Sequence, residues 1–206
     1  VFVGSNGRAE IDFGSGLAWL SGGTTLYFEQ LDDHHIRARM SDGQLVVRLR
    51  ELDRGETARI DTRSGSIDLT TPGLYRVETG ANNNSRGDLI HVKYGNAELS
   101  TGGAFESLRG GDAAGFNGNR VGFLNISGDD AFGEWADSRD RRYQGQRYAY
   151  VSPNMVGWRE LDEHGVWREI GSYGWVWFPR RVSYDWAPYR FGHWTFVSPW
   201  GWTWVD

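Results

Sequence analysis

The residues of this chain that could bind a metal ion or move a proton are its histidines and its paired carboxylates. The five histidines are scattered, and only His34 and His35 are neighbours. Beside Asp32 and Asp33 they could hold a divalent cation. A solvated loop explains the same four residues without a ligand, because polar residues gather in turns. We predict no metal ion and no cofactor.

Two neighbouring carboxylates could also serve as the acid and base of a glycosidase. Such pairs occur at Asp32–Asp33, Asp129–Asp130 and Asp162–Glu163, but none stands in a motif that would position a substrate. The chain has no Gly-x-Ser-x-Gly elbow and no phosphate-binding glycine loop. It has no cysteine, so disulfides and thiolate chemistry are excluded. We therefore predict no catalytic residues and a protein that is not an enzyme.

Tryptophan forms the most specific pattern of the sequence. Nine of the eleven tryptophans lie between Trp158 and Trp204, where a glycine beside a tryptophan keeps recurring. Such rings pack as cross-strand pairs, stack with nearby arginines, or stack on the faces of sugars. Tryptophans two residues apart lie on one face of a strand. The predicted contact surface comprises Trp175, Trp177, Trp186, Tyr189, Trp194, Trp200, Trp202 and Trp204.

This aromatic surface predicts contact with another copy of the chain, a partner protein or a glycan. Exposed apolar patches larger than a few hundred Å² mark interaction sites. Because no set of sugar-binding polar groups stands beside the rings, self-association is favoured over glycan binding. We expect Trp200, Trp202 and Trp204 near an exposed strand edge that a neighbour completes.

The elements that must position these residues are mostly strands. From Gly7 to about Phe116, apolar and polar residues alternate between glycine-containing turns, which is typical of an antiparallel β-sandwich or roll. The pattern predicts separate strands before and after a turn at Ser41–Gly43, and again around a turn at Arg63–Gly65. The fold class is therefore mainly β.

One amphipathic helix is predicted after these strands. Asp129 or Asp130 can cap it, Phe132 and Trp135 follow at helical spacing, and Gly145 can end it. We expect three parts: a β-domain over residues 1–118, a linker with the connector helix over 119–148, and a small aromatic β-module over 149–206.

Charge and hydropathy limit the partners. The net charge is −5, and acidic residues interrupt the Arg-rich stretch from Arg37 to Arg63, so no nucleic-acid partner is expected. No apolar run approaches the roughly 20 residues that span a bilayer, which predicts no transmembrane segment in this chain. A mature or trimmed form would also open at Val1 without an apolar leader, so the missing leader does not argue against export.

The first half resembles the FecR domain, an extracytoplasmic β-domain of bacterial sigma-regulator proteins. The resemblance rests on Gly43–Val47, Ala58–Thr62, Ser66–Val77 and Val92–Leu99. Pro72–Tyr75 stands where the family more often has a Gly-Thr-x-Phe step. The resemblance implies a FecR-like antiparallel fold, and it raises a FecR-type signalling role as an alternative. That role would require a transmembrane segment and a cytoplasmic helix upstream.

The second half resembles a Trp/Tyr/Gly-rich domain of unknown function that follows FecR-like domains in exported proteobacterial proteins. The residues concerned are Tyr150–Pro153, Tyr173–Pro179, Trp186–Trp194 and Pro199–Asp206. In that family a further aromatic repeat usually follows the position of Asp206. The resemblance attaches no catalytic residue to either half. It implies a periplasmic, secreted or cell-surface protein of a Gram-negative bacterium.

The function predicted from these observations is that of an exported, non-enzymatic structural or interaction protein. Its aromatic module would mediate self-association or contact with another protein of the cell envelope. The alternatives are a glycan-binding module, an accessory of a cell-wall or polysaccharide hydrolase, and FecR-type signalling.

Overall fold

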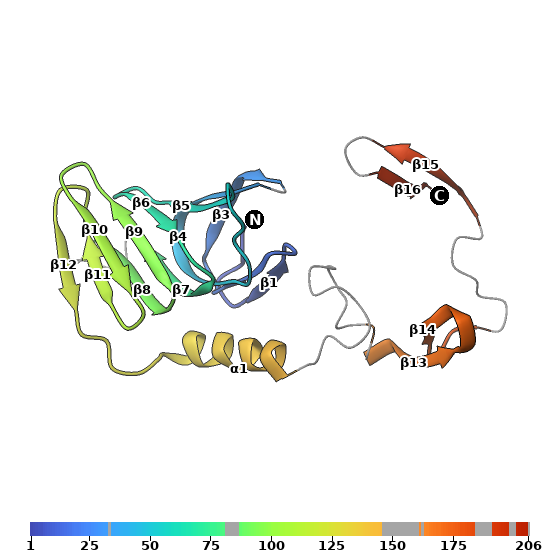
Figure 1. Cartoon of the computed structure of the whole chain (residues 1–206). Coiled ribbons are helices and arrows are strands. Elements are labelled where there is room, and N and C mark those ends of the chain that lie inside the picture. The colour runs from blue at the N-terminus through green and yellow to red at the C-terminus, as the bar shows by residue number, and fades with distance from the viewer. Residues whose placement is uncertain are drawn as a thin grey trace. The chain divides into compact units, whose positions relative to one another are not determined.

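The computed structural model describes residues 1–32, 34–80, 87–145, 161, 163–183, 191–197 and 201–205. The chain divides into two compact units, Val1–Val156 and Gly157–Asp206. Within the described residues the first unit is a β-domain with one α-helix, and the second contains two small β-hairpins (Figure 1). The prediction of a mainly β chain with one helix and a small aromatic β-module is confirmed.

In the described part of the first unit all strands except β4 are short, as the spacing of its glycine turns predicts. In chain order these are β1 (Ala9–Asp12), β2 (Gly16–Leu20), β3 (Thr25–Leu31), β4 (His35–Leu49), β5 (Thr57–Asp61), β6 (Ser66–Leu69), β7 (Gly73–Thr79), β8 (Asp88–Tyr94), β9 (Asn96–Ser100), β10 (Phe105–Arg109), β11 (Ala113–Phe116) and β12 (Val121–Leu124).

Strand β4 joins two layers of sheet. Its first half pairs with β3 and β5, and that layer continues through β6 and β9 to β10. Its second half pairs with β2 and β7, and that layer runs from β1 to β12 by way of β8 and β11. Below, the first is called the upper layer and the second the lower layer.

The predicted turn at Ser41–Gly43 is wrong, because the chain continues through it as one strand. Gly43 has φ +101°, which bends the strand without reversing it. A Cβ atom on Gly43 would lie 2.3 Å from Thr24 Oγ1, so only glycine fits beside this neighbour. The bend carries β4 from the upper layer into the lower one. By contrast, the predicted turn at Arg63–Gly65 is present between β5 and β6.

One pair of strands departs from the predicted antiparallel arrangement. Residues His35–Arg39 of β4 pair in parallel with Thr57–Asp61 of β5. The chain leaves β4 in the lower layer and crosses back through residues 50–56 before it re-enters the upper layer. It thus starts β5 beside the beginning of β4, which makes this pair parallel.

The core lies between the two layers. Leu45, Val47 and Leu49 of β4 alternate toward it, as period-two spacing requires, and Val46 points to the other face. Ile60 of the upper layer and Tyr75 of the lower layer belong to the same cluster. The two layers therefore form a sandwich over one apolar core.

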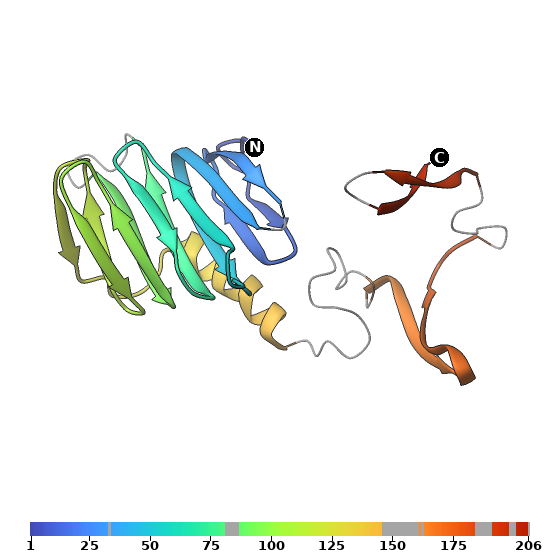
Figure 2. The ribbon, with the colours of Figure 1, turned by 45° about the horizontal axis from the view of Figure 1, so that its top comes forward.

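Helix α1 (Ala131–Gly145) covers the outer face of the lower layer (Figure 2). The predicted cap is present, because Asp130 Oδ1 accepts a hydrogen bond from the Gly133 amide at 2.8 Å. The helix buries Phe132 and Ala136 against a second apolar cluster that includes Trp19 of β2. The part of this face that lies beneath the helix is therefore buried as well.

The second unit contains two hairpins with a common design. One joins β13 (Gly165–Ile170) to β14 (Gly174–Pro179) through a short 3₁₀ turn at Gly171–Tyr173. The other joins β15 (His193–Val197) to β16 (Gly201–Val205). Each is an antiparallel two-stranded sheet, a unit with little stability of its own in water.

Candidate functional site

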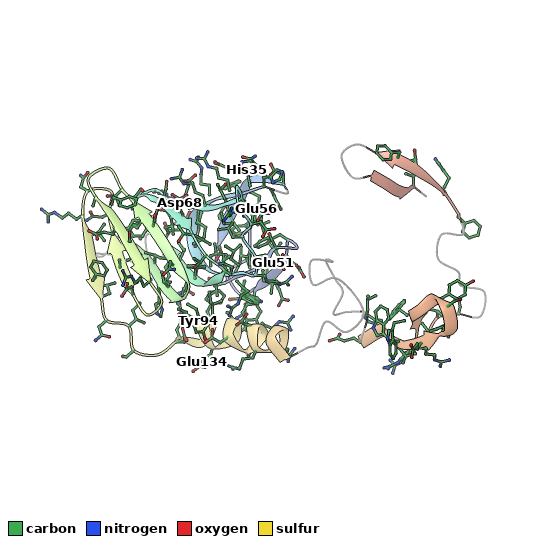
Figure 3. The ribbon with its side chains drawn as sticks, viewed as in Figure 1. His35, Glu51, Glu56, Asp68, Tyr94 and Glu134 are labelled. Atoms are coloured by element: carbon green, nitrogen blue, oxygen red, sulfur yellow. The ribbon has the colours of Figure 1, made fainter. Side chains whose placement is uncertain are left out.

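The acidic and histidine residues at the β3–β4 turn form a structural cap. Asp32 Oδ1 accepts hydrogen bonds from the amides of His34 and His35 at 2.9 and 2.8 Å. Its other oxygen accepts from the Gln30 side chain at 2.7 Å, and these bonds hold the pKa of Asp32 below its usual range. His35 is at this exposed turn (Figure 3). Asp33 lies outside the described residues, among which no cluster of three possible metal ligands occurs.

The Asp129–Asp130 pair belongs to an ion-pair cluster beneath α1. The side chain of Arg76 on β7 is only 8% exposed, and it donates two hydrogen bonds to Asp130 at 2.9 and 2.7 Å. Lys93 on β8 is equally buried, and its Nζ atom lies 2.7 Å from Asp129 and 2.8 Å from Asp137. Three carboxylates of the helix region thus meet two cations of the sheet.

Further charged contacts hold the rest of the helix. Arg48 of β4 pairs with Asp140 and lies over the ring of Tyr94 at 5.4 Å (Figure 3). Arg139 donates to Glu10 of β1 at 2.6 Å. Because burying charged groups carries a large desolvation cost, we expect these ion pairs to select one docking position for the helix more than to add stability.

The same cluster sets the charge state of the carboxylates. The bidentate hydrogen bonds from the Arg76 guanidinium keep the pKa of Asp130 well below its usual range. Burial opposes the charge of Asp129, but the hydrogen bond and charge of Lys93 outweigh it and keep that pKa low as well. Both groups stabilise the folded state above about pH 4 and lose this contribution as acid protonates them.

The surroundings of His91 on β8 predict a second, milder dependence of folding stability on pH. Burial lowers the pKa of His91, and the nearby Lys93 and Arg76 lower it further, against the attraction of Asp129 and Asp137. His91 therefore binds a proton more readily in the unfolded chain than in the folded one. Its contribution to folding stability is fully present above about pH 6.5 and decreases as the pH falls below that value. We expect His91→Gln to remove the loss of melting temperature between about pH 7.5 and 5.5. Equal slopes for parent and variant would contradict this assignment.

The first hairpin brings its tryptophans together across the strands. Trp167 lies directly opposite Trp177, and Glu169 lies opposite Trp175, so all four residues share one face. On the other face the Arg168 guanidinium lies over the ring of Phe178 at 5.3 Å. Both faces of this hairpin are therefore aromatic.

Trp177 and Trp175 have different surroundings. The Trp177 indole N–H donates to the carbonyl oxygen of Leu161 at 2.7 Å, and its ring covers Gly165. Trp175 is 47% exposed, and Tyr173 at the tip of the hairpin is 83% exposed. Trp177 thus stabilises the hairpin, while the rings of Trp175 and Tyr173 are exposed to solvent.

Gly165→Ala tests the role of Trp177. A Cβ atom at position 165 would lie 2.1 Å from the Trp177 indole, which must then leave Leu161. We expect a local destabilisation of the hairpin of about 1–3 kcal/mol, seen as faster hydrogen exchange of the β13 and β14 amides. The matched control is Gly122→Ala on β12, where an added Cβ meets nothing within 4 Å. Unchanged exchange in Gly165→Ala would show that Trp177 does not hold the hairpin.

In the second hairpin the backbone register pairs position 194 with 204 and position 196 with 202. This places Trp194, Phe196, Trp202 and Trp204 on one face, as the two-residue spacing predicts. Phe196 is 64% exposed, and Phe191, just before β15, is 81% exposed.

The predicted contact surface is thus described in part. Trp175 and Trp177 lie on β14, and the backbones of Trp194, Trp202 and Trp204 lie on β15 and β16. Trp186, Tyr189 and Trp200 lie outside the described residues. β16 pairs on one side with β15, and its other edge meets no described strand. That a neighbour completes this edge stays a prediction.

Comparison with known protein families finds a match within the second unit. Residues 158–206 match a family of unknown function, DUF6600. The predicted resemblance of the aromatic half to a domain of unknown function is thereby confirmed over these residues. No curated protein matches the chain.

The fold also occurs in solved structures. Two crystal structures of a "putative anti-sigma factor" from Parabacteroides distasonis ATCC 8503 align with TM-scores of 0.55 and 0.54. Sequence identity is 13% and 12%, and each alignment covers 87% of this chain and 98% of the other. At this identity the likeness concerns the fold alone.

The cluster beneath α1 was not predicted from the sequence. Arg76 and Lys93 occupy alternating polar positions of strands, and their carboxylate partners in the helix region lie 36–54 residues away. The available signal is the acidic pair Asp129–Asp130 at the start of the helix, whose residue types predict a helix cap but no partner in the sheet. Within the described residues no helix is both long and apolar enough to cross a membrane.

Proposed function

We propose that this chain is an exported, non-enzymatic interaction protein of the bacterial envelope. Its β-domain acts as a rigid carrier, and its aromatic hairpins make the contact. One observation carries the proposal: among the residues of the second unit whose exposure is described, only Gly165 is buried. Several large apolar side chains there are exposed, including Tyr173 and Phe196, while Trp167 and Trp177 are half-buried.

The first unit gives the contrast that supports this interpretation. There the largest fully buried side chains are aromatic: Trp19, Tyr75 and Phe116 are at most 1% exposed, although other rings such as Tyr27 and Phe123 lie at the surface. In the second unit no aromatic side chain whose exposure is described is buried, so its rings do not form a core of this kind. Contiguous exposed apolar surface marks an interaction site.

The absence of enzymatic activity is part of the proposal and can be tested directly. The purified chain should release no product from peptidoglycan or from common polysaccharides over long incubation. Reproducible turnover that disappears when a single carboxylate, such as Glu163, is changed to the amide would overturn the proposal. Retention on a glycan column without turnover would instead identify the partner as a glycan.

Export is supported by the resemblance of both halves to domains of exported proteins. The test is fractionation of a Gram-negative host that expresses the full-length gene product. We expect the protein in the periplasm, in the medium or on the cell surface. Recovery in the cytoplasm, together with a cytoplasmic marker enzyme, would overturn the localisation.

A second candidate function is FecR-type signalling. It is favoured by the fold, because the chain covers 98% of the solved structure of the Parabacteroides protein. The FecR resemblance of residues 43–99 points the same way. In this function the β-domain would be the extracytoplasmic part of a sigma regulator. The full-length gene product would then carry a membrane span and a cytoplasmic helix upstream, and its deletion would change transcription from a sigma-dependent reporter.

A further inference from the structure

Asparagine is followed directly by glycine at two places in the sequence, Asn6–Gly7 and Asn117–Gly118. An asparagine in this position can react with its own backbone. Glycine has no side chain, so nothing keeps its amide nitrogen away from the carboxamide of the preceding residue. Both asparagines are exposed. Exposure therefore does not distinguish the two steps, and the surroundings of the two glycine amides decide which of them reacts.

The amide of Gly7 is held in a hydrogen bond. Its N–H donates to the carbonyl oxygen of Gly4 at 2.8 Å. The chain beside this turn is fixed as well, because the Val3 N–H donates to Thr24 at 3.0 Å and the Val3 carbonyl accepts from Gly23 at 2.9 Å. Before the Gly7 nitrogen can attack the carboxamide of Asn6, it must give up its bond to Gly4.

The amide of Gly118 has no such bond. The Asn117 N–H donates to the carbonyl oxygen of Arg120 at 3.2 Å, which closes the turn between β11 and β12. Gly118 has φ +87°, the left-handed conformation that tight hairpin turns require. Its N–H donates no hydrogen bond within the described residues. The Gly118 nitrogen can therefore approach the Asn117 carboxamide without breaking a bond.

We infer that Asn117 is a site of spontaneous modification, at which the carboxamide becomes a carboxylate. The Gly118 nitrogen gives up its proton and forms a bond to Asn117 Cγ. The bond from Cγ to Nδ2 breaks, and Nδ2 leaves as ammonia with that proton, so a five-membered cyclic imide closes. Water then opens the imide at either carbonyl group and a proton is released. One product is aspartate, and the other is isoaspartate, whose main chain runs through the former side chain. Water is the only co-reactant.

The two products affect the hairpin differently. Isoaspartate lengthens the main chain by one methylene group, directly after the pair Phe116–Val121 that begins the β11–β12 register. Among the described strands β12 pairs with β11 alone, so nothing else holds its register. Aspartate keeps the main chain as it was and adds one negative charge at an exposed position. Isoaspartate should therefore loosen β12, and aspartate should not.

The two Asn-Gly steps can be compared within one sample of the full chain. After incubation in alkaline buffer, trypsin cuts behind Arg8, Arg109 and Arg120 and places the steps in separate peptides, residues 1–8 and 110–120. Tandem mass spectrometry locates each modified residue, with an unincubated sample as the zero point. We expect Asn117 to convert about two- to tenfold faster than Asn6, the range that one hydrogen bond implies. Equal rates, or faster conversion of Asn6, would overturn the inference.

Two controls assign the difference to the fold and to the residue. In concentrated urea both turns are lost, so the two rates should converge. A difference that persists in urea comes from the neighbouring residues in the sequence and contradicts the structural argument. Asn117→Gln should stop the reaction in the peptide 110–120, because glutamine would have to close a less favourable six-membered ring. If this peptide still converts at the parent's rate, the reaction belongs to Asn119 and the inference fails.

The effect on β12 is measured by amide hydrogen exchange over Val121–Leu124. Ion-exchange chromatography separates the modified protein from the parent, since modification adds a negative charge. We expect faster exchange of these amides in the isoaspartate form and the parent's exchange in Asn117→Asp, which carries the same charge on an unaltered main chain. Unchanged exchange in the isoaspartate form, or equally fast exchange in Asn117→Asp, would overturn the proposed effect of the longer main chain.

Discussion

Trp19→Ala is expected to lower the free energy of unfolding of the β-domain by about 3–5 kcal/mol. Trp19 is fully buried on β2, where it packs in one cluster with Phe132 and Ala136 of α1. Its indole N–H also donates to Glu10 at 3.0 Å. Truncation leaves a cavity between sheet and helix and removes that bond. Urea unfolding followed by far-UV circular dichroism measures the effect.

The control for this prediction is Phe123→Ala on β12. Phe123 is 59% exposed, so its truncation should change stability by no more than about 0.5 kcal/mol. If Trp19→Ala is as mild as this control, α1 does not rest on the lower layer as described. A large loss of unfolding free energy, with an unchanged helical signal before unfolding begins, would show that the helix stays docked over the cavity.

Arg76→Met is expected to destabilise the domain by about 3 kcal/mol, because it removes one partner of a buried cluster. Asp130 at 2.7 Å and Glu78 at 2.8 Å would lose this cation, and Asp129, 3.6 Å from Arg76, would keep only Lys93. The guanidinium also lies over the ring of Phe132 at 5.8 Å. The loss should appear first as release of α1, measured by amide hydrogen exchange across Ala131–Gly145.

Arg76→Lys separates charge from geometry. Lysine keeps the positive charge but cannot form the two-pronged bond to Asp130, so an intermediate loss is expected. The loss in Arg76→Met should also shrink at acidic pH, where the stranded carboxylates are neutral. A pH-independent effect of Arg76→Met, equal to that of Arg76→Lys, would show that packing rather than charge dominates at this position.

The strands and the helix were predictable because their signals are local. Alternation along Leu45–Leu49 reflects the two faces of one strand, and it holds for either packing partner. Asp130 and Gly145 mark the ends of α1 through backbone groups only a few residues away. The placement of Trp175 and Trp177 on one face of β14 follows from the same short-range geometry.

The errors came from residues whose role depends on distant partners. A glycine such as Gly43 is equally compatible with a turn and with a bend in a strand. Here the chain bends, because Gly43 packs against Thr24 and pairs with β7. The parallel pairing of β4 with β5 depends on which layer the chain re-enters after residue 50. Neither the bend at Gly43 nor the parallel pairing can be predicted from the neighbouring residues in the sequence.

The candidate site shows the same division. The sequence by itself determined that the C-terminal strands are aromatic, with paired tryptophans on shared faces, because spacing along a strand sets its face. Only the tertiary structure showed that these two tryptophans differ. Trp177 donates a hydrogen bond to the Leu161 carbonyl, whereas Trp175 is half-exposed. Likewise Arg48 and Asp140 are 92 residues apart and meet only because α1 docks on the sheet. Burial and ion pairing are properties of the assembled fold, since they depend on what packs nearby and not on what precedes in the chain.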